Sequence, residues 1–208
     1  IMAGTLYHIV LGAAQFEVIW AVEDKGFNPN TFGQINGWIF VVFGVLGSLF
    51  GGIASDWTLR KYNLPRTWFL LILTLLFMPL AFTRYLDTDS ILFWVGICSS
   101  AFSLGCFYGP VFAVIQELVP PTIKGTVVAF NLLCLNMLGI ALGSILFGIL
   151  ADYAVTQGYE NPYTNLLVGF SCVFLVFGPI LYYLAGRFYE QDKNCLLYTS
   201  DAADEGLG

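Results

Sequence analysis

The sequence has few charged residues for its length. Only 11% of the 208 residues are charged, 58% are hydrophobic, and the mean hydropathy is +0.77. Soluble domains carry about 25% charged and about 45–50% apolar residues, so a water-soluble globule could not bury this much apolar surface. Disordered chains are poor in apolar residues, which excludes disorder as well. The composition therefore indicates a polytopic membrane protein.

Patterns for metal or hydrolytic chemistry are also lacking. Four of the five cysteines lie in apolar runs without Cys-x-x-Cys spacing, and we interpret Cys98, Cys106, Cys134 and Cys172 as packing residues. An intramembrane serine protease would need a serine and a histidine from different helices. The sequence has one histidine, His8, and no Gly-x-Ser-Gly motif. An intramembrane enzyme is thus a remote alternative, and we expect no catalytic residue, cofactor, metal or nucleic-acid partner.

Six long apolar runs account for the hydrophobic excess. A helix needs about 20 apolar residues to cross a bilayer. Runs of suitable length lie roughly at 1–22, 34–55, 67–83, 90–118, 125–151 and 163–186. The sequence therefore predicts an all-α membrane protein with six transmembrane helices.

The basic residues predict the direction of these spans. Six of them would lie on one side of the membrane: Arg60, Lys61, Arg66, Lys124, Arg187 and Lys193. Only Lys25 and Arg84 would lie on the other side. Loops rich in lysine and arginine face the cytoplasm. We therefore expect a multi-pass protein of a plasma or inner membrane with its C-terminus in the cytoplasm.

A short pattern recurs in the two halves of the sequence. The second run ends with Gly52 and Asp56, and the fifth ends with Gly148 and Asp152, with three residues between each pair. The two copies would lie on opposite faces of the membrane. A three-plus-three inverted repeat, of the kind that builds secondary transporters, predicts this arrangement; coincidence is the alternative.

Both ends of the chain look artificial. It opens within an apolar run at Ile1, and residues 195–205 resemble a translated sequencing-library adapter. We therefore take 1–194 as the structural unit and expect 195–208 to be an artefactual or disordered tail. Omitting this tail leaves 11 acidic residues against 8 basic ones, which changes the net charge from −6 to −3.

The polar stretch after the second run resembles a loop signature of the major facilitator superfamily, Gly-x-x-x-Asp-basic-x-Gly-basic-basic. The matching positions are Gly52, Asp56, Arg60 and Lys61, whereas Trp57 and Leu59 depart from the pattern. The resemblance implies that the chain is the C-terminal six-helix half of such a transporter. It also implies that Asp56 latches the two halves together, with its partner in an N-terminal half that this chain lacks.

A longer stretch is similar to spinster-like facilitators of the same superfamily. It runs from Gly109 through the Gln-x-Leu-Val-Pro-Pro turn at 116–121 to Lys124 and the small residue after it. This resemblance implies a transporter that carries lysolipids, sphingolipids or similar amphiphiles by alternating access. A facilitator for small organic anions or drugs is the alternative within the class.

Polar residues inside the predicted spans are candidates to line a substrate cavity, because such residues are costly in the membrane. In the first run these are His8, Gln15 and Glu17. His8 and Gln15 share a face of a regular helix, whereas Glu17 lies nearly opposite Gln15. We expect Glu17 near the outer end, where it snorkels or lines the outer mouth; an interhelical hydrogen bond is the alternative for each residue.

Two later runs carry the other candidates. They are Ser99 and Ser103 in the fourth run, and Asn131 and Asn136 in the fifth. Close helix packing is the alternative interpretation for these four residues. The pair Gly109-Pro110 predicts a bend in the fourth run. The implied partners are the lipid bilayer, the N-terminal half, and a lipid or other small-molecule substrate.

Overall fold

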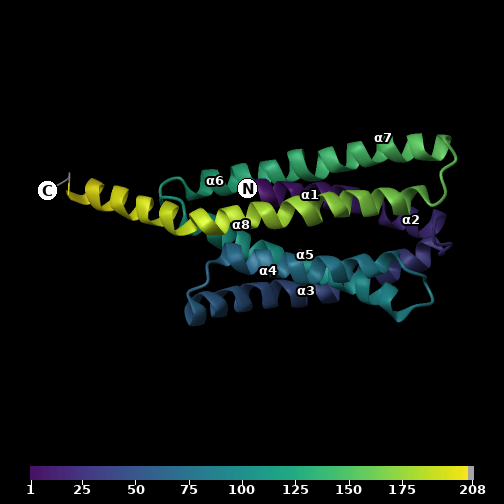
Figure 1. Cartoon of the computed structure of the whole chain (residues 1–208), viewed down its shortest axis with the longest axis horizontal. Helices are drawn as coiled ribbons and strands as arrows, with labels where there is room; N and C mark the ends of the chain where they lie inside the picture. Colours follow the sequence, from purple (N-terminus) through teal and green to yellow (C-terminus); the bar gives the residue numbers. More distant parts are fainter. Residues whose placement is uncertain (206–208) are drawn as a thin grey trace.

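The computed structural model describes residues 1–205, without the side chains of residue 190 and residues 196–205. The described backbone is helical apart from short turns and loops (Figure 1). The helices are α1 (Met2–Ala14), α2 (Glu17–Glu23), α3 (Pro29–Tyr62), α4 (Arg66–Ala81), the 3-10 helix η1 (Phe82–Tyr85), α5 (Ile91–Glu117), α6 (Lys124–Leu133), the π-helix η2 (Cys134–Ala141), α7 (Leu142–Thr156) and α8 (Pro162–Glu205).

Among the described residues, five helical segments are long and apolar enough to cross a membrane. They are Pro29–Tyr62, Arg66–Tyr85, Ile91–Glu117, Lys124–Thr156 and Pro162–Cys195. A sixth span forms when α1 and α2, which meet at a bend of 42°, are counted together. The all-α membrane architecture predicted from the sequence is therefore confirmed.

The first span differs from the regular helix that the sequence predicted. Gln15 and Phe16 separate α1 from α2, and their backbone N–H groups donate to carbonyls three residues earlier, those of Gly12 and Ala13. This tight turn changes the direction of the chain just before Glu17. The helical-wheel relation between Gln15 and Glu17 therefore does not hold.

Polar side chains fix the start of two long helices. The Oδ1 atom of Asn28 accepts from the backbone N–H groups of Asn30 and Thr31 at the start of α3, which satisfies donors that the first helical turn leaves free. Ser90 does the same for Leu92 at the start of α5. At the other end of α3, Asn63 has a φ of 54°, the left-handed conformation that ends many helices.

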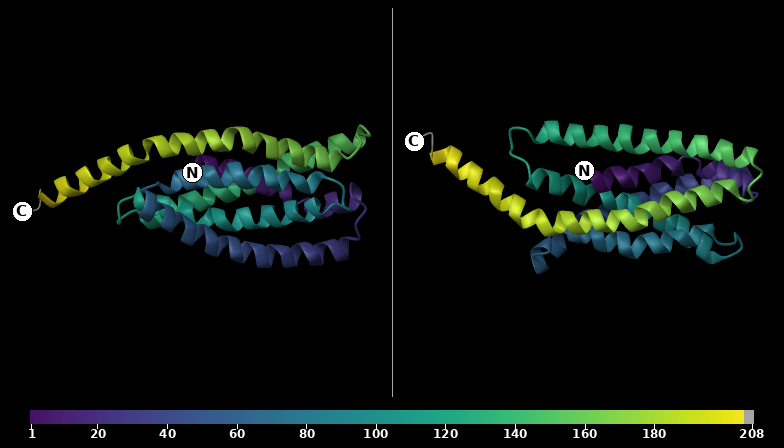
Figure 2. Two further views of the ribbon diagram at one scale, coloured as in Figure 1. Left: turned by 60° about the horizontal axis from the view of Figure 1, so that its bottom comes forward. Right: turned by 45° about the horizontal axis from the view of Figure 1, so that its top comes forward.

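The six spans pack in two equivalent groups of three. One group contains α3, α4 and α5; the other contains α1, the span with η2 and α7, and α8. The span containing α3 packs along α5, as the span containing η2 and α7 packs along α1. In the same way α4 packs on α5, α8 packs on α1, and α4 and α8 meet each other (Figures 1 and 2). Each of these contacts is reproduced when the first three spans are exchanged with the last three, as an inverted repeat requires.

Glycines allow the closest helix contacts in both groups. A Cβ atom at Gly47 of α3 would lie 2.2 Å from the Phe102 carbonyl oxygen of α5. One at Gly143 of α7 would lie 2.2 Å from the Ile9 carbonyl oxygen of α1. Small residues in transmembrane helices permit this backbone approach. Gly47 thus occupies on α3 the place that Gly143 occupies on α7, in the same register that pairs Gly52 with Gly148.

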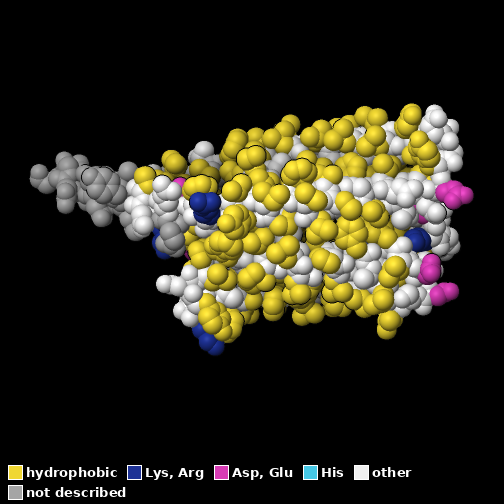
Figure 3. All heavy atoms as spheres, viewed as in Figure 1, with side chains coloured by type: hydrophobic (Ala, Val, Ile, Leu, Met, Phe, Trp, Pro, Cys, Tyr) yellow, Lys and Arg dark blue, Asp and Glu magenta, His cyan; other side chains and the backbone are white. Residues whose placement is uncertain are grey.

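On the face drawn in Figure 3, hydrophobic side chains cover the length of the bundle and charged side chains lie toward its ends. We call the end where α3 meets α4 and α5 meets α6 the basic end, because Arg60, Lys61 and Lys124 lie there. The opposite end holds the α2–α3, η1–α5 and α7–α8 connections. Large side chains such as Trp38, at 68% exposed, cover the surface between them, as expected of a protein solvated by lipid.

Helix α8 extends beyond the bundle toward the C-terminus (Figure 2). The expected tail, 195–208, therefore begins within this helix, and residues 206–208 lie outside the described part of the chain. The adapter interpretation of 195–205 concerns the origin of the segment, and it stays a prediction.

Candidate functional site

A buried ion pair joins the first and third spans near the end opposite the basic end. Arg84 of η1 donates through Nη1 to Glu17 Oε1 of α2 at 2.7 Å. The two side chains are only 7% and 5% exposed. Arg84 also donates to the hydroxyl groups of Tyr85 at 2.8 Å and Ser100 at 3.4 Å. Burial of two charges is tolerated in such a site because they are paired and hydrogen-bonded.

These positions bear on two expectations. Glu17, which was expected to snorkel or to line the outer mouth, is 4% exposed and is paired with Arg84, which matches the interhelical alternative. Arg84 was counted as a loop residue on the outer side, yet it is 6% exposed and ends the third span. The sequence missed Arg84 because it follows the apolar run directly, where burial cannot be distinguished from a flanking loop.

An open groove of about 320 Å³ lies beside the ion pair. Its polar lining consists of Gln15, Glu17 and Asn36, the last at the second turn of α3. Nδ2 of Asn36 donates to Glu17 Oε2 at 3.2 Å. Gln15 is exposed, whereas Glu17 and Asn36 are buried in the wall. The structure therefore brings together two of the predicted cavity residues and adds Asn36, which the sequence analysis missed.

A small cavity of about 60 Å³ lies behind the ion pair, inside the bundle. Arg84 and Tyr85 line it together with the hydroxyl groups of Ser100, Ser103 and Ser171. Such a volume holds a few water molecules. The rest of its lining is largely apolar. The cavity and the groove are neighbours that share Leu11, Ala14 and Phe40, whereas Arg84 lines only the cavity and Glu17 only the groove.

His8 is a buried interhelical hydrogen-bonding residue. Its Nδ1 lies 2.8 Å from the Gly4 carbonyl oxygen and its Nε2 lies 3.1 Å from the Tyr108 hydroxyl of α5. A carbonyl can only accept, so Nδ1 carries the proton and Nε2 is free to accept from Tyr108. His8 is 1% exposed. This geometry matches the interhelical alternative, and a cavity-lining role for His8 stays a prediction.

The other predicted cavity residues do not converge on one place. Ser99 faces an apolar pocket with Phe102, whereas Ser103 lines the small internal cavity. Asn131 is fully buried, and neither atom of its side-chain amide has a hydrogen-bond partner. Asn136 is exposed and donates to the Leu132 carbonyl of its own helical segment.

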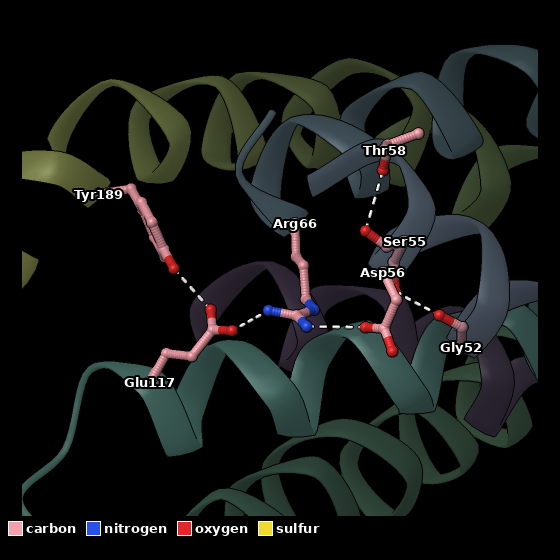
Figure 4. A network of polar contacts seen from close by, with 7 residues as sticks. All are labelled: Gly52, Ser55, Asp56, Thr58, Arg66, Glu117 and Tyr189. Atoms are coloured by element: carbon pink, nitrogen blue, oxygen red, sulfur yellow. Dashed lines mark hydrogen bonds and ion pairs between the residues drawn. The ribbon is translucent and has the colours of Figure 1, made fainter. Parts of the chain in front are cut away.

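A second charged cluster lies at the basic end, and Figure 4 shows it from close by. Arg66, at the start of α4, lies between two carboxylates: Nη2 pairs with Asp56 of α3 at 2.7 Å, and Nη1 pairs with Glu117 of α5. The Tyr189 hydroxyl of α8 donates to the other oxygen of Glu117 at 2.5 Å. Four spans therefore meet in one network.

Asp56 of the loop motif has a partner within this chain. Asp56 pairs with Arg66 of the same chain, although its side chain stays 49% exposed on the remaining side. Of the other motif residues, Arg60 and Lys61 are exposed, and Lys61 Nζ lies 4.9 Å from the centre of the Trp57 ring. A contact from Asp56 to a second half stays a prediction.

Two further expectations concern backbone shape and metals. Helix α5 continues through Gly109-Pro110, with Pro110 buried, so the predicted bend does not interrupt the helix. Within residues 1–205, apart from the side chains not described, no group of three histidine, cysteine or acidic residues could hold a metal ion.

The fold and the two charged clusters define a multi-pass α-helical membrane protein with polar groups enclosed between its spans. Residues 1–144 match the model of the Major Facilitator Superfamily. The chain therefore belongs to this family, whose members are membrane transporters and not enzymes. No curated protein sequence matches the chain.

One solved structure has a similar fold. It is the crystal structure of a bacterial homologue of the human lysosomal transporter Spinster, in an inward-facing and unoccupied conformation. The TM-score is 0.68 and the sequence identity 19%; the match covers 90% of this chain and 48% of that protein. At this identity the likeness shows the fold alone. The chain thus has the fold of one half of a major facilitator transporter and spans about half the length of the homologue.

Proposed function

We propose that this chain is one six-helix half of a secondary transporter that works by alternating access. Membership of the Major Facilitator Superfamily, together with a fold that covers half of a spinster homologue, carries the proposal. Transporters of this architecture bind substrate near the middle of the membrane, between their repeats. The partner is then a second, N-terminal six-helix half.

The open groove is the substrate-facing part of this half. Its lining comes from α1, α2, α3 and η2, and it contains no residue of α4 or α8, the pair that joins the two groups of three spans. Apolar side chains form most of its wall, among them Leu11, Val18, Phe40 and Ile140. A groove with mostly apolar side chains and a few polar ones suits a lysolipid, a sphingolipid or a similar amphiphile.

A small organic anion is the second candidate substrate. The arginine nearest the groove, Arg84, is already paired with Glu17 and faces the internal cavity. Anion recognition usually needs an available arginine or lysine. The groove itself therefore favours the amphiphile, and an anion would have to be held by basic residues of the other half.

The cluster around Arg66 is proposed as the gating network of this half. Positive residues collect at the same end, which supports a cytoplasmic location for that end and for the C-terminus. The side chain of Asp56 is half exposed there. When the cytoplasmic side closes, this carboxylate would contact the other half; when it opens, Arg66 would hold it in this half.

Reconstitution into liposomes tests the transport proposal. The chain, co-expressed with an N-terminal half of a spinster-like transporter, should support lysolipid uptake, whereas each half alone should not. Transport by the isolated chain would overturn the half-transporter assignment. A stable assembly of both halves that moves organic anions but no amphiphile would instead select the second candidate.

A further inference from the structure

The buried amide of Asn36 has one unpartnered atom whose identity is fixed by its surroundings. Nδ2 faces the carboxylate of Glu17. A carboxylate paired with arginine only accepts hydrogen bonds, so the nitrogen of the amide must be the atom on that side. The carbonyl atom Oδ1 is therefore the one left without a partner, in a side chain that is 9% exposed.

An unpartnered buried acceptor is costly, and a hydrogen-bond donor that reaches it recovers that cost. Asn36 is also part of the groove lining, where Glu17 is its polar neighbour. The Oδ1 atom has almost no exposed surface of its own, so a ligand reaches it only when the side chain turns toward the groove. A small tilt of the side chain toward the groove would present it to a ligand, while Nδ2 stays directed at Glu17.

The charges near the groove decide what kind of ligand it selects. Arg84 neutralises Glu17, and its guanidinium faces the internal cavity on the far side. The polar part of the groove wall consequently presents a carboxylate and an amide oxygen, which are acceptors. Gln15, exposed at the same groove, can turn either end of its amide to a ligand.

We propose that this groove binds the head group of an amphiphile through N–H or O–H donors, with a protonated primary amine as the favoured head and Asn36 Oδ1 as the selecting acceptor. The apolar side chains of Leu11, Phe40 and Ile140 would hold the adjoining hydrocarbon chain. This proposal rests on the transport function above and specifies the substrate class for the same groove.

Binding measurements on the chain in lipid nanodiscs test the proposal without requiring transport. Octylamine, octyltrimethylammonium and octanoate share an apolar chain but differ in the head group. The first has a positive charge and N–H donors, the second a positive charge without donors, and the third a negative charge without donors. Calorimetric titration, with empty nanodiscs as the blank, gives the three affinities. We expect octylamine to bind about tenfold more tightly than the trimethyl compound, the typical worth of a charged hydrogen bond, and octanoate to bind most weakly.

Two asparagine variants place the selection at Asn36. The substitution Asn36→Leu should remove the preference for octylamine over octyltrimethylammonium. The matched change Asn165→Leu should preserve it, because that amide is exposed on α8, outside the groove lining, and donates to the Glu160 carbonyl. If Asn36→Leu does not fold, the comparison of ligands on the unaltered chain still decides.

Equal affinity of the unaltered chain for octylamine and octyltrimethylammonium would overturn the proposal, as would a preference that survives Asn36→Leu. Either result leaves the transporter assignment standing. Conversely, donor-selective binding by a chain that supports no uptake with a second half would separate this site from the proposed function.

Discussion

Removing one partner of the Glu17–Arg84 ion pair should destabilise the chain strongly. In Arg84→Met the carboxylate of Glu17 keeps only the Asn36 amide as a donor, inside a site where both charged side chains are less than a tenth exposed. An uncompensated buried charge of this kind costs about 3–5 kcal/mol. In Glu17→Gln the guanidinium keeps the hydroxyl groups of Tyr85 and Ser100, so the loss should lie at the lower end of that range.

The double variant distinguishes a coupled pair from two independent losses. Glu17→Gln with Arg84→Met leaves no charge in the site, so we expect it to lose less stability than the sum of the two single losses, and less than Arg84→Met alone. Unfolding by sodium dodecyl sulfate in mixed micelles, followed by circular dichroism, measures these differences. Arg187→Met, at an exposed position, is the control and should change little. Additive losses in the double variant would refute the reasoning.

The same unfolding measurement tests three further expectations. Gly143→Ala should cost several kcal/mol because its Cβ would lie 2.2 Å from a carbonyl oxygen, whereas Gly125→Ala, with nothing within 4 Å, should be neutral or slightly stabilising. Asn131→Leu should stabilise the chain by about 1–3 kcal/mol because both amide atoms are buried without partners; a loss of stability would mean that the amide is paired. Arg66→Leu should destabilise the chain by about 1–3 kcal/mol, between the values for an exposed and a buried ion pair, because it leaves the partly exposed Asp56 and Glu117 without their shared cation; Asp56→Asn should restore part of this loss.

The fold could be predicted because the length of the apolar runs and a repeated motif constrain it strongly. Apolar runs long enough to span a membrane have few alternatives to helices, and the pattern shared by Gly52–Asp56 and Gly148–Asp152 indicated the repeat. The structure shows the repeat more directly in the close approaches at Gly47 and Gly143. Those glycines are visible in the sequence, but only tertiary packing shows which of the 22 glycines lie against a neighbouring backbone.

The candidate site could be predicted only in part, because it depends on contacts between distant segments. Glu17 and Gln15 were identified as polar residues in an apolar span, which is a local signal. Asn36 and Arg84 lie near the ends of apolar runs, where a polar residue is ordinary. Their importance arises from a contact with Glu17, 19 and 67 residues away in sequence, and no local pattern records such a contact.

The break between α1 and α2, which shapes the groove, could not be predicted from the sequence. Neither proline nor glycine occupies positions 15 and 16, so the sequence predicts an uninterrupted helix there. In the structure, α2 is held from outside its own sequence: Glu17 by Arg84, and the Nε1–H of Trp20 by the Thr164 hydroxyl of α8 at 2.8 Å. These tertiary contacts, and not local propensity, account for the direction of α2. They bring Glu17 next to Asn36 on the groove wall, so the ion pair shapes the binding surface as well as stabilising the bundle.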